Sequence, residues 1–139
     1  MKADIVVKGI IWNSSMKRLL IVQRNRTDSV GANTWENIGG NIEIGENIEE
    51  GLRREISEEV GITDITIKKV AYVTLINGEE PYLIIVDLCE TNTKEVTLSF
   101  EHQSYLWADA EECRRKLPKE ILDDFERNGI WELFDKAGE

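Results

Sequence analysis

The sequence predicts an α+β fold in which a mixed β-sheet carries helices on both faces. Two turn signals, Asn13–Ser15 and Asn77-Gly78, each separate a pair of runs rich in β-branched and aliphatic residues, as in β-hairpins. Between the hairpins, apolar residues recur every four positions, which is typical of an amphipathic helix. Hairpins with interspersed helices favour a mixed sheet over regular βαβ alternation. The length of 139 residues predicts a single domain over residues 1–139.

The first part of the chain begins with a predicted hairpin, formed by Ile5–Trp12 and by residues 19–22. Asn25–Thr34 is polar and irregular, so we expect a loop there that could bind a ligand. A short strand is expected at Thr34–Asn37. It leads into Gly39-Gly40, where the missing Cβ atoms let the backbone turn tightly or approach a ligand closely.

The clearest helix is expected between Asn47 and Val60, because Gly61 follows it at the position of a C-terminal cap. Its apolar stripe consists of Ile48, Leu52, Ile56 and Val60. Such a stripe buries one side of a helix against a core and leaves the other side free for polar groups.

The second hairpin is expected from Ile65–Ile76 and Tyr82–Cys89, two strand-like runs on either side of the Asn-Gly turn. Tyr105–Trp107 indicates a further short strand. Pro118 then opens a helix that is interrupted before Ile130–Phe134, since proline is well tolerated at the first position of a helix.

Charge and composition exclude several classes of protein. The chain has 17 Lys and Arg against 27 Asp and Glu, a formal net charge of −10, which argues against a nucleic acid polymer or a membrane surface as partner. Cys89 and Cys113 form no CxxC pair, so we expect plain thiols in a reducing compartment. The apolar runs are too short to span a bilayer, and the first residues do not resemble a signal peptide. We therefore expect a cytoplasmic protein.

An acidic cluster lies on the predicted helix between Asn47 and Val60. With Glu55 at zero on a helical wheel, Glu59 falls at about +40° and Glu58 at about −60°, so the three carboxylates share a face. Like charges this close repel, and a divalent cation among them would relieve the repulsion. Carboxylate oxygens select Mg²⁺, with Mn²⁺ as a substitute, and Mg²⁺ commonly also binds substrate phosphates. The alternative is a solvated acidic face without a metal.

The spacing of the residues around this cluster matches a known family. The pattern G-x5-E-x7-R-E-U-x-E-E-x-G-U, with U an aliphatic residue, is present in full from Gly40 to Ile62. In this respect the chain resembles the Nudix (MutT-type) hydrolases. The resemblance extends over roughly residues 4 to 112 and includes Trp35–Gly40 and the Glu-His segment Glu101–Trp107. One departure is Ile38, where the family usually has a proline; isoleucine is freer in φ and carries an additional N–H donor, which leaves the stiffness of this loop open.

The resemblance implies a Nudix-type α/β/α sandwich that hydrolyses a pyrophosphate bond in a nucleoside diphosphate linked to another group. It implies that Glu55 and Glu59 are the principal metal ligands, with the carbonyl of Gly40 as a further ligand. Glu58 would be another ligand or the general base, and Glu101 is the competing candidate for either role.

The other candidate residues are expected to have supporting or structural roles rather than catalytic ones. Arg54 would orient a glutamate through charge-assisted hydrogen bonds, as metal ligands commonly require. Glu46 lies near the start of the helix, where stabilising the helix dipole or fixing the loop is enough to explain it. His102, the one histidine, is interpreted as a structural hydrogen-bonding residue. Trp35, Tyr82 and Trp107 are interpreted as core aromatics, so none is assigned to a base pocket.

The expected substrate is a small nucleotide, either a nucleoside triphosphate or a dinucleoside polyphosphate, cleaved with Mg²⁺. The alternative from another class is a non-catalytic Nudix-fold module that senses a nucleotide, but such a module would not need the intact acidic cluster. A homodimer is compatible with the sequence, which does not decide it.

Overall fold

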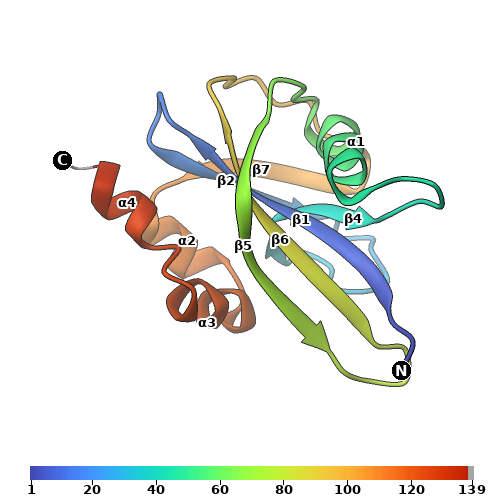
Figure 1. The fold of residues 1–139 in the computed structure, drawn as a ribbon. Coiled ribbons are helices and arrows are strands. Elements are labelled where there is room, and N and C mark those ends of the chain that lie inside the picture. The colour runs from blue at the N-terminus through green and yellow to red at the C-terminus, as the bar shows by residue number, and fades with distance from the viewer. Residues whose placement is uncertain (138–139) are drawn as a thin grey trace.

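The structure is a computed structural model that describes residues 1–137, and a seven-stranded mixed sheet forms its centre. The strands are β1 (Asp4–Asn13), β2 (Arg18–Arg24), β3 (Trp35–Glu36), β4 (Ile38–Asn41), β5 (Thr66–Ile76), β6 (Tyr82–Thr91) and β7 (His102–Ala108). The helices are α1 (Ile48–Val60), α2 (Ala110–Lys116), α3 (Lys119–Arg127) and α4 (Glu132–Ala137). The predicted α+β fold with helices on both faces of a mixed sheet is confirmed (Figure 1).

β1 is the central strand, and both of its edges are paired. Along its whole length it pairs in parallel with β6, which in turn pairs antiparallel with the edge strand β5. On its other edge, β1 pairs antiparallel with β4 through Val6–Gly9 and with β2 through Ile11–Asn13. β2 extends the sheet by pairing with β3 and β7. Both predicted hairpins, β1–β2 and β5–β6, are confirmed, and the parallel β1–β6 contact makes the sheet mixed.

α1 covers one face of the sheet, and its boundaries follow from its caps. The Asn47 side chain accepts a hydrogen bond from the backbone N–H of Glu50, whose side chain accepts one from the N–H of Asn47, forming a capping box. Gly61 ends the helix at φ 72°, a left-handed conformation that glycine adopts without steric cost. Of the predicted stripe, Leu52, Ile56 and Val60 are fully buried against the sheet, whereas Ile48 is 40% exposed.

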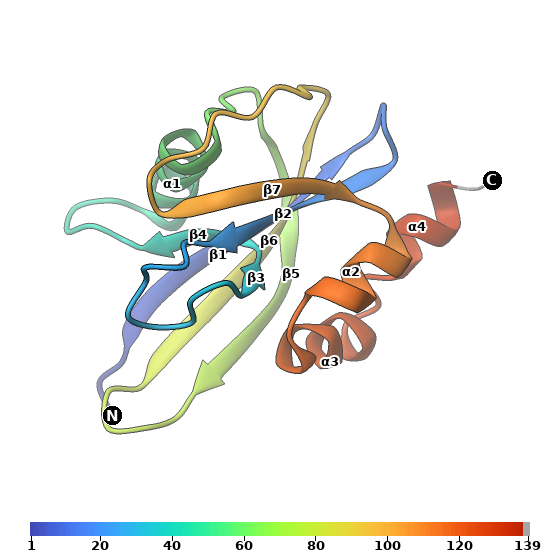
Figure 2. The same cartoon turned by 180° about the vertical axis from the view of Figure 1, so that it is seen from behind.

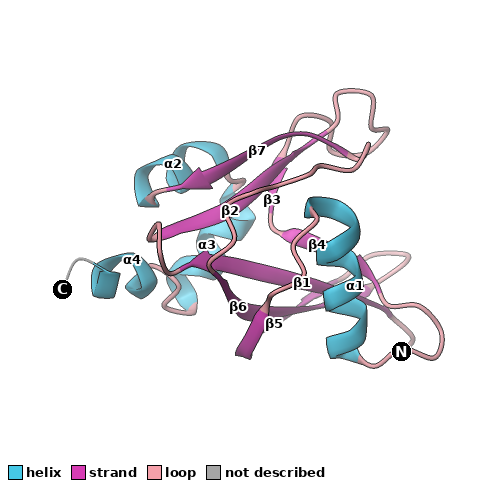
Figure 3. Cartoon of the chain, turned by 90° about the horizontal axis from the view of Figure 1, so that it is seen from above, coloured by secondary structure: helices cyan, strands magenta, loops and turns pink. Residues whose placement is uncertain are grey.

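The opposite face of the sheet is covered by α2, α3 and α4 (Figures 2 and 3). Here aromatic rings pack edge to face, with centroids 5.1 Å apart for Trp12 and Phe134 and 5.4 Å apart for Phe125 and Trp131. The sequence did not predict α2, because it is short and buries only Cys113, so it has no apolar period. Asp109 and Glu112 form its capping box.

Two strands differ from the sequence-based expectation. β4 was not predicted, because Gly39 and Gly40 give no strand signal, but pairing with β1 holds them extended. β7 begins at His102 rather than Tyr105, since its register with β2 continues to Arg24 across a bulge. Within residues 1–137, no helix has the length and apolar composition needed to cross a membrane.

Candidate functional site

A cleft of about 790 Å³ opens on the face of the sheet that carries α3. Its apolar floor includes Tyr72, Ile84 and Val86 from β5 and β6, and Ile121 of α3 lies along one side. At its other end the lining changes to charged groups from β1, β2, β3, the C-terminal part of α1 and the segment that leads into β7, beside the backbone of β4. The cleft therefore joins an apolar surface to a strongly charged one.

Glu59 is the most deeply buried acid at the charged end, with 4% of the residue exposed. Its Oε2 accepts a hydrogen bond of 2.9 Å from the backbone N–H of Gly39. Burial raises its pKa to about 8, and the neighbouring carboxylates of Glu55 and Glu101 act in the same direction, whereas Lys8 opposes them. Gly39 is required here because a Cβ at its φ of 155° would overlap the backbone of Val7 on β1.

Glu55 lies one turn before Glu59 and faces the backbone of Gly40. A Cβ atom at Gly40 would lie 2.8 Å from both carboxylate oxygens of Glu55, so the glycine allows the backbone and the carboxylate to approach each other. Burial raises the pKa of Glu55, while the adjacent Arg54 guanidinium lowers it. The motif glycine and the motif glutamate thus meet in space, although 14 positions separate them in the sequence.

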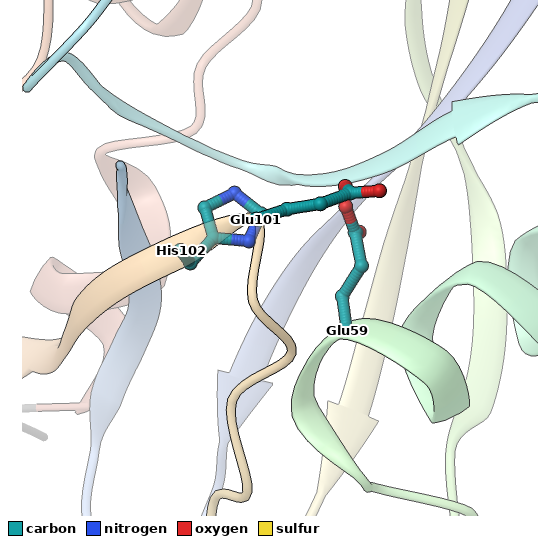
Figure 4. A group of neighbouring side chains, drawn as sticks. All are labelled: Glu59, Glu101 and His102. Atoms are coloured by element: carbon teal, nitrogen blue, oxygen red, sulfur yellow. The ribbon is translucent and has the colours of Figure 1, made fainter. Parts of the chain in front are cut away.

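Glu101 and His102 reach the same place from the start of β7 (Figure 4). Glu59, Glu101 and His102 each offer one ligand atom, and these atoms lie within 4.8 Å of one another. Figure 4 shows the carboxylates of Glu59 and Glu101 meeting beside β4. The backbone supports this meeting, because the N–H of Ser99 donates to the carbonyl of Glu59 and holds the incoming segment against the end of α1.

Arg54 ties the acidic residues around it together. Its guanidinium donates to both carboxylate oxygens of Glu46 at 2.7 and 3.0 Å, to Glu55 at 3.1 Å and to Glu58 at 3.2 Å. It also donates to the carbonyl of Asn41 at 3.1 Å. The pKa of Arg54 is raised, mainly by the bond to Glu46, so the guanidinium stays charged. This network fixes the loop before α1 and orients the Glu55 carboxylate.

Glu36 organises a second charged group on the wall of the cleft. Its carboxylate accepts hydrogen bonds from Nε2 of His102 at 2.9 Å, from Nζ of Lys8 at 3.3 Å and from Nη1 of Arg24 at 3.3 Å. Burial would raise the pKa of Glu36, but His102 and the two cations together lower it to about 2. Nδ1 of His102 is buried and has no hydrogen-bond partner within residues 1–137.

Comparison with known proteins decides the family. The model of the NUDIX domain matches residues 3–127. The chain belongs to the Nudix hydrolase family. A nucleoside triphosphatase, NudI, from Salmonella paratyphi B is 33% identical over 123 residues, covering 81% of this chain and 86% of that protein. A MutT protein from Methanosarcina mazei Go1 superposes with a TM-score of 0.75 at 28% identity and 99% and 96% coverage. A NUDIX-family hydrolase from Clostridium perfringens, at 18% identity, has the same fold with a TM-score of 0.75 over 97% of this chain and 98% of that one.

The predicted membership of the Nudix hydrolases is therefore confirmed, and the chain is a Nudix pyrophosphohydrolase. The structure places four of the predicted Nudix site residues in the lining of the cleft: Gly40, Glu55, Glu59 and Glu101. Arg54 and Glu58 lie outside this lining. The side chain of Glu58 is 60% exposed and is bonded to Arg54, because the turn of α1 directs it to the outer side.

Ile38, the departure from the usual Nudix proline, is fully buried in the core beneath α1 and pairs with Gly9. Packing and strand pairing thus restrict the backbone of this segment, as the fixed φ of a proline would do.

Several cleft residues of this Nudix enzyme were not singled out from the sequence. Lys8 and Arg24 come from strands that read as ordinary hairpin strands, and Tyr72, Ile121 and Asp124 come from segments far along the chain. One signal was available in the sequence, because the charged Lys8 interrupts the apolar run of β1. The face of the sheet on which Lys8 lies becomes known only when the register of β1 is known. Tyr82, interpreted as a core aromatic, lines the cleft and is 37% exposed.

Proposed function

We propose that this Nudix enzyme hydrolyses a pyrophosphate bond of nucleoside triphosphates with Mg²⁺ as its metal. The observation that carries the proposal is the convergence of Glu55, Glu59 and Glu101 at one end of a cleft. A nucleotide in this cleft would place its phosphates at the charged end and its base over the apolar floor.

The residues at the charged end fit a divalent cation. Glu59 is buried beside two further carboxylates, and its raised pKa reflects a site that disfavours negative charge unless a positive charge joins it. Glu55 and Glu59 would supply carboxylate oxygens and Gly40 a carbonyl, the ligand types that suit Mg²⁺ or Mn²⁺. When bound, such an ion polarises phosphoryl oxygens and lowers the pKa of an attacking water.

The chain's own residues would perform the remaining tasks. Glu101 lies in the cleft and would accept the proton of the water whose oxygen forms a bond to phosphorus as the bridging P–O bond breaks. Glu58 points away from the cleft, which supports a positioning role through Arg54 rather than the role of general base. Arg54 would keep the Glu55 carboxylate oriented.

The nucleoside triphosphate class is supported by the NudI relative, which is 33% identical over most of both chains. The sequence leaves dinucleoside polyphosphates as the second class to test. Both carry the same polyphosphate group, so the charged end of the cleft suits either, and the base or second nucleoside must discriminate between them.

A product assay tests this proposal. Purified chain would be incubated with nucleoside triphosphates and dinucleoside polyphosphates, with Mg²⁺ or with a chelator, and the released pyrophosphate and phosphate would be measured separately. We expect Mg²⁺-dependent hydrolysis that Glu59→Gln lowers by a factor of about 100 or more, because it removes a charged ligand. The matched control is Glu90→Gln, which breaks an exposed ion pair with Lys68 on the sheet. Turnover that survives chelation, or full turnover in a folded Glu59→Gln variant, would refute the proposed mechanism.

A further inference from the structure

We propose that Glu36 is a positioning residue that holds Lys8 and Arg24 as a pair of phosphate-binding cations facing the acidic cluster. This inference rests on the proposed function, because it assigns the residues that would receive the polyphosphate. Glu36 lies within Trp35–Gly40, a segment outside the acidic motif that also resembles the Nudix family.

The cations lie where substrate phosphates would need them. The same cleft is lined by the two cations, Lys8 and Arg24, and by the acids Glu59 and Glu101. Lys8 is close enough to Glu59 to lower the pKa of that carboxyl. A protein with a net charge of −10 repels a polyphosphate at long range, so positive groups inside the cleft must offset that repulsion. The bonds of both cations to Glu36 place them on the same wall.

Both cations need to be held, because long basic side chains are flexible. Lys8 is anchored by Glu36 and by the carbonyl of Asn37, each at 3.3 Å. Arg24 is held more fully, because Nη2 donates to Asp28 at 2.7 Å and Nε donates to the carbonyl of Val30 at 3.1 Å. Glu36 is thus the carboxylate that the two cations share.

Glu36 itself is fixed from the opposite side. Its Oε2 accepts from Nε2 of His102, whose side chain is 2% exposed and therefore rigidly packed. A carboxylate can only accept, so Nε2 carries the hydrogen. His102 directly follows Glu101 in the chain, and the same contact therefore links the cation pair to the segment that carries Glu101. The Glu36 carboxylate thus connects the two cations to the segment that carries Glu101.

The substitution Glu36→Gln tests this role. Glutamine keeps the shape and can still accept from His102, but it loses the charge that holds the two cations. Freed cations still attract phosphate, so we expect KM to stay within about threefold, while kcat falls about 10- to 100-fold because the phosphates are no longer oriented. A merely structural defect would instead lower the melting temperature and raise KM. Glu90→Gln, which removes an ion pair with Lys68 outside the cleft lining, serves as the control and should leave both parameters unchanged.

The cations are tested separately by binding of inorganic tripolyphosphate with Mg²⁺, measured by calorimetry. We expect Lys8→Met to weaken this binding about tenfold, because it removes one charged hydrogen bond to phosphate. In a chain that already carries Lys8→Met, Glu36→Gln should lower kcat by a smaller factor than it does in the wild-type chain, because the two residues act together.

Three results would overturn the inference: a kcat for Glu36→Gln within threefold of wild type, an unchanged tripolyphosphate affinity in Lys8→Met, or fully multiplicative losses in the double variant. If the wild-type chain binds tripolyphosphate but hydrolyses no nucleotide, the proposed function fails, and the effect of Lys8→Met on binding then decides the inference. If Glu36→Gln does not fold, Glu36→Asp, which keeps the charge but shortens its reach to both cations, is measured in its place by the same kcat and KM criteria.

Discussion

Replacing Glu59 by glutamine should change how the stability of the metal-free chain depends on pH. In the folded chain, burial raises the pKa of Glu59 from 4.5 to about 8, whereas the unfolded chain has the ordinary value. Between these two pH values the folded state holds one proton more than the unfolded state. The free energy of unfolding of the wild-type chain must therefore fall as the pH rises through this window.

The size of the effect follows from the two pKa values. Each pH unit between 4.5 and about 8 lowers the free energy of unfolding by about 1.4 kcal/mol, an upper limit of about 5 kcal/mol across the window. Glu59 is only 4% exposed, so solvent screens it weakly. This loss is comparable with the total stability of about 5–15 kcal/mol that is usual for a domain. Glutamine does not titrate, so Glu59→Gln should lack this loss.

Urea unfolding of the chelator-treated chain at pH values from 4.5 to 8.5 measures the effect. We expect Glu59→Gln to become progressively more stable than wild type as the pH rises, with no further gain above pH 8. Glu58→Gln is the matched control on the same helix, because its side chain is 60% exposed and points away from the cleft. Stability curves of wild type and Glu59→Gln that run parallel across this range would refute the argument that burial of Glu59 destabilises its charged form.

Adding millimolar Mg²⁺ should raise the melting temperature more at pH 8 than at pH 5, because the metal competes with the proton for Glu59; an equal shift at both pH values in a scanning experiment would contradict this. Gly40→Ala should lower turnover strongly while Gly78→Ala does not, because a methyl group at Gly40 would lie 2.8 Å from the Glu55 carboxylate, whereas at Gly78 it would meet no atom within 4 Å. Asn47→Ala should reduce the free energy of unfolding in urea by about 1 kcal/mol through loss of the α1 cap, and an unchanged midpoint would count against that bond as a stabilising contact.

Local patterns in the sequence were sufficient to predict the helices and strands whose signals lie within a few neighbouring residues. The two hairpins and α1 belong to this group, because turn residues, apolar period and caps act between near neighbours. α2 lacks an apolar period, and β4 is rich in glycine, so both depend on the contacts that the rest of the chain provides. The existence of β4 could not be predicted from local residues, and the local signal for α2 is limited to its capping box.

The sequence by itself determined the family and the acidic motif, because the motif is a spacing along one loop and one helix. Only the tertiary structure decided which acids lie together: it turned Glu58 outward on α1, buried Glu59 against Gly39 and brought Glu101 to it from the start of β7. It also assembled Lys8, Arg24 and Glu36 on one wall. The physical reason is that the direction of a side chain depends on strand register and on packing between distant segments, and neither is encoded in the spacing of a motif.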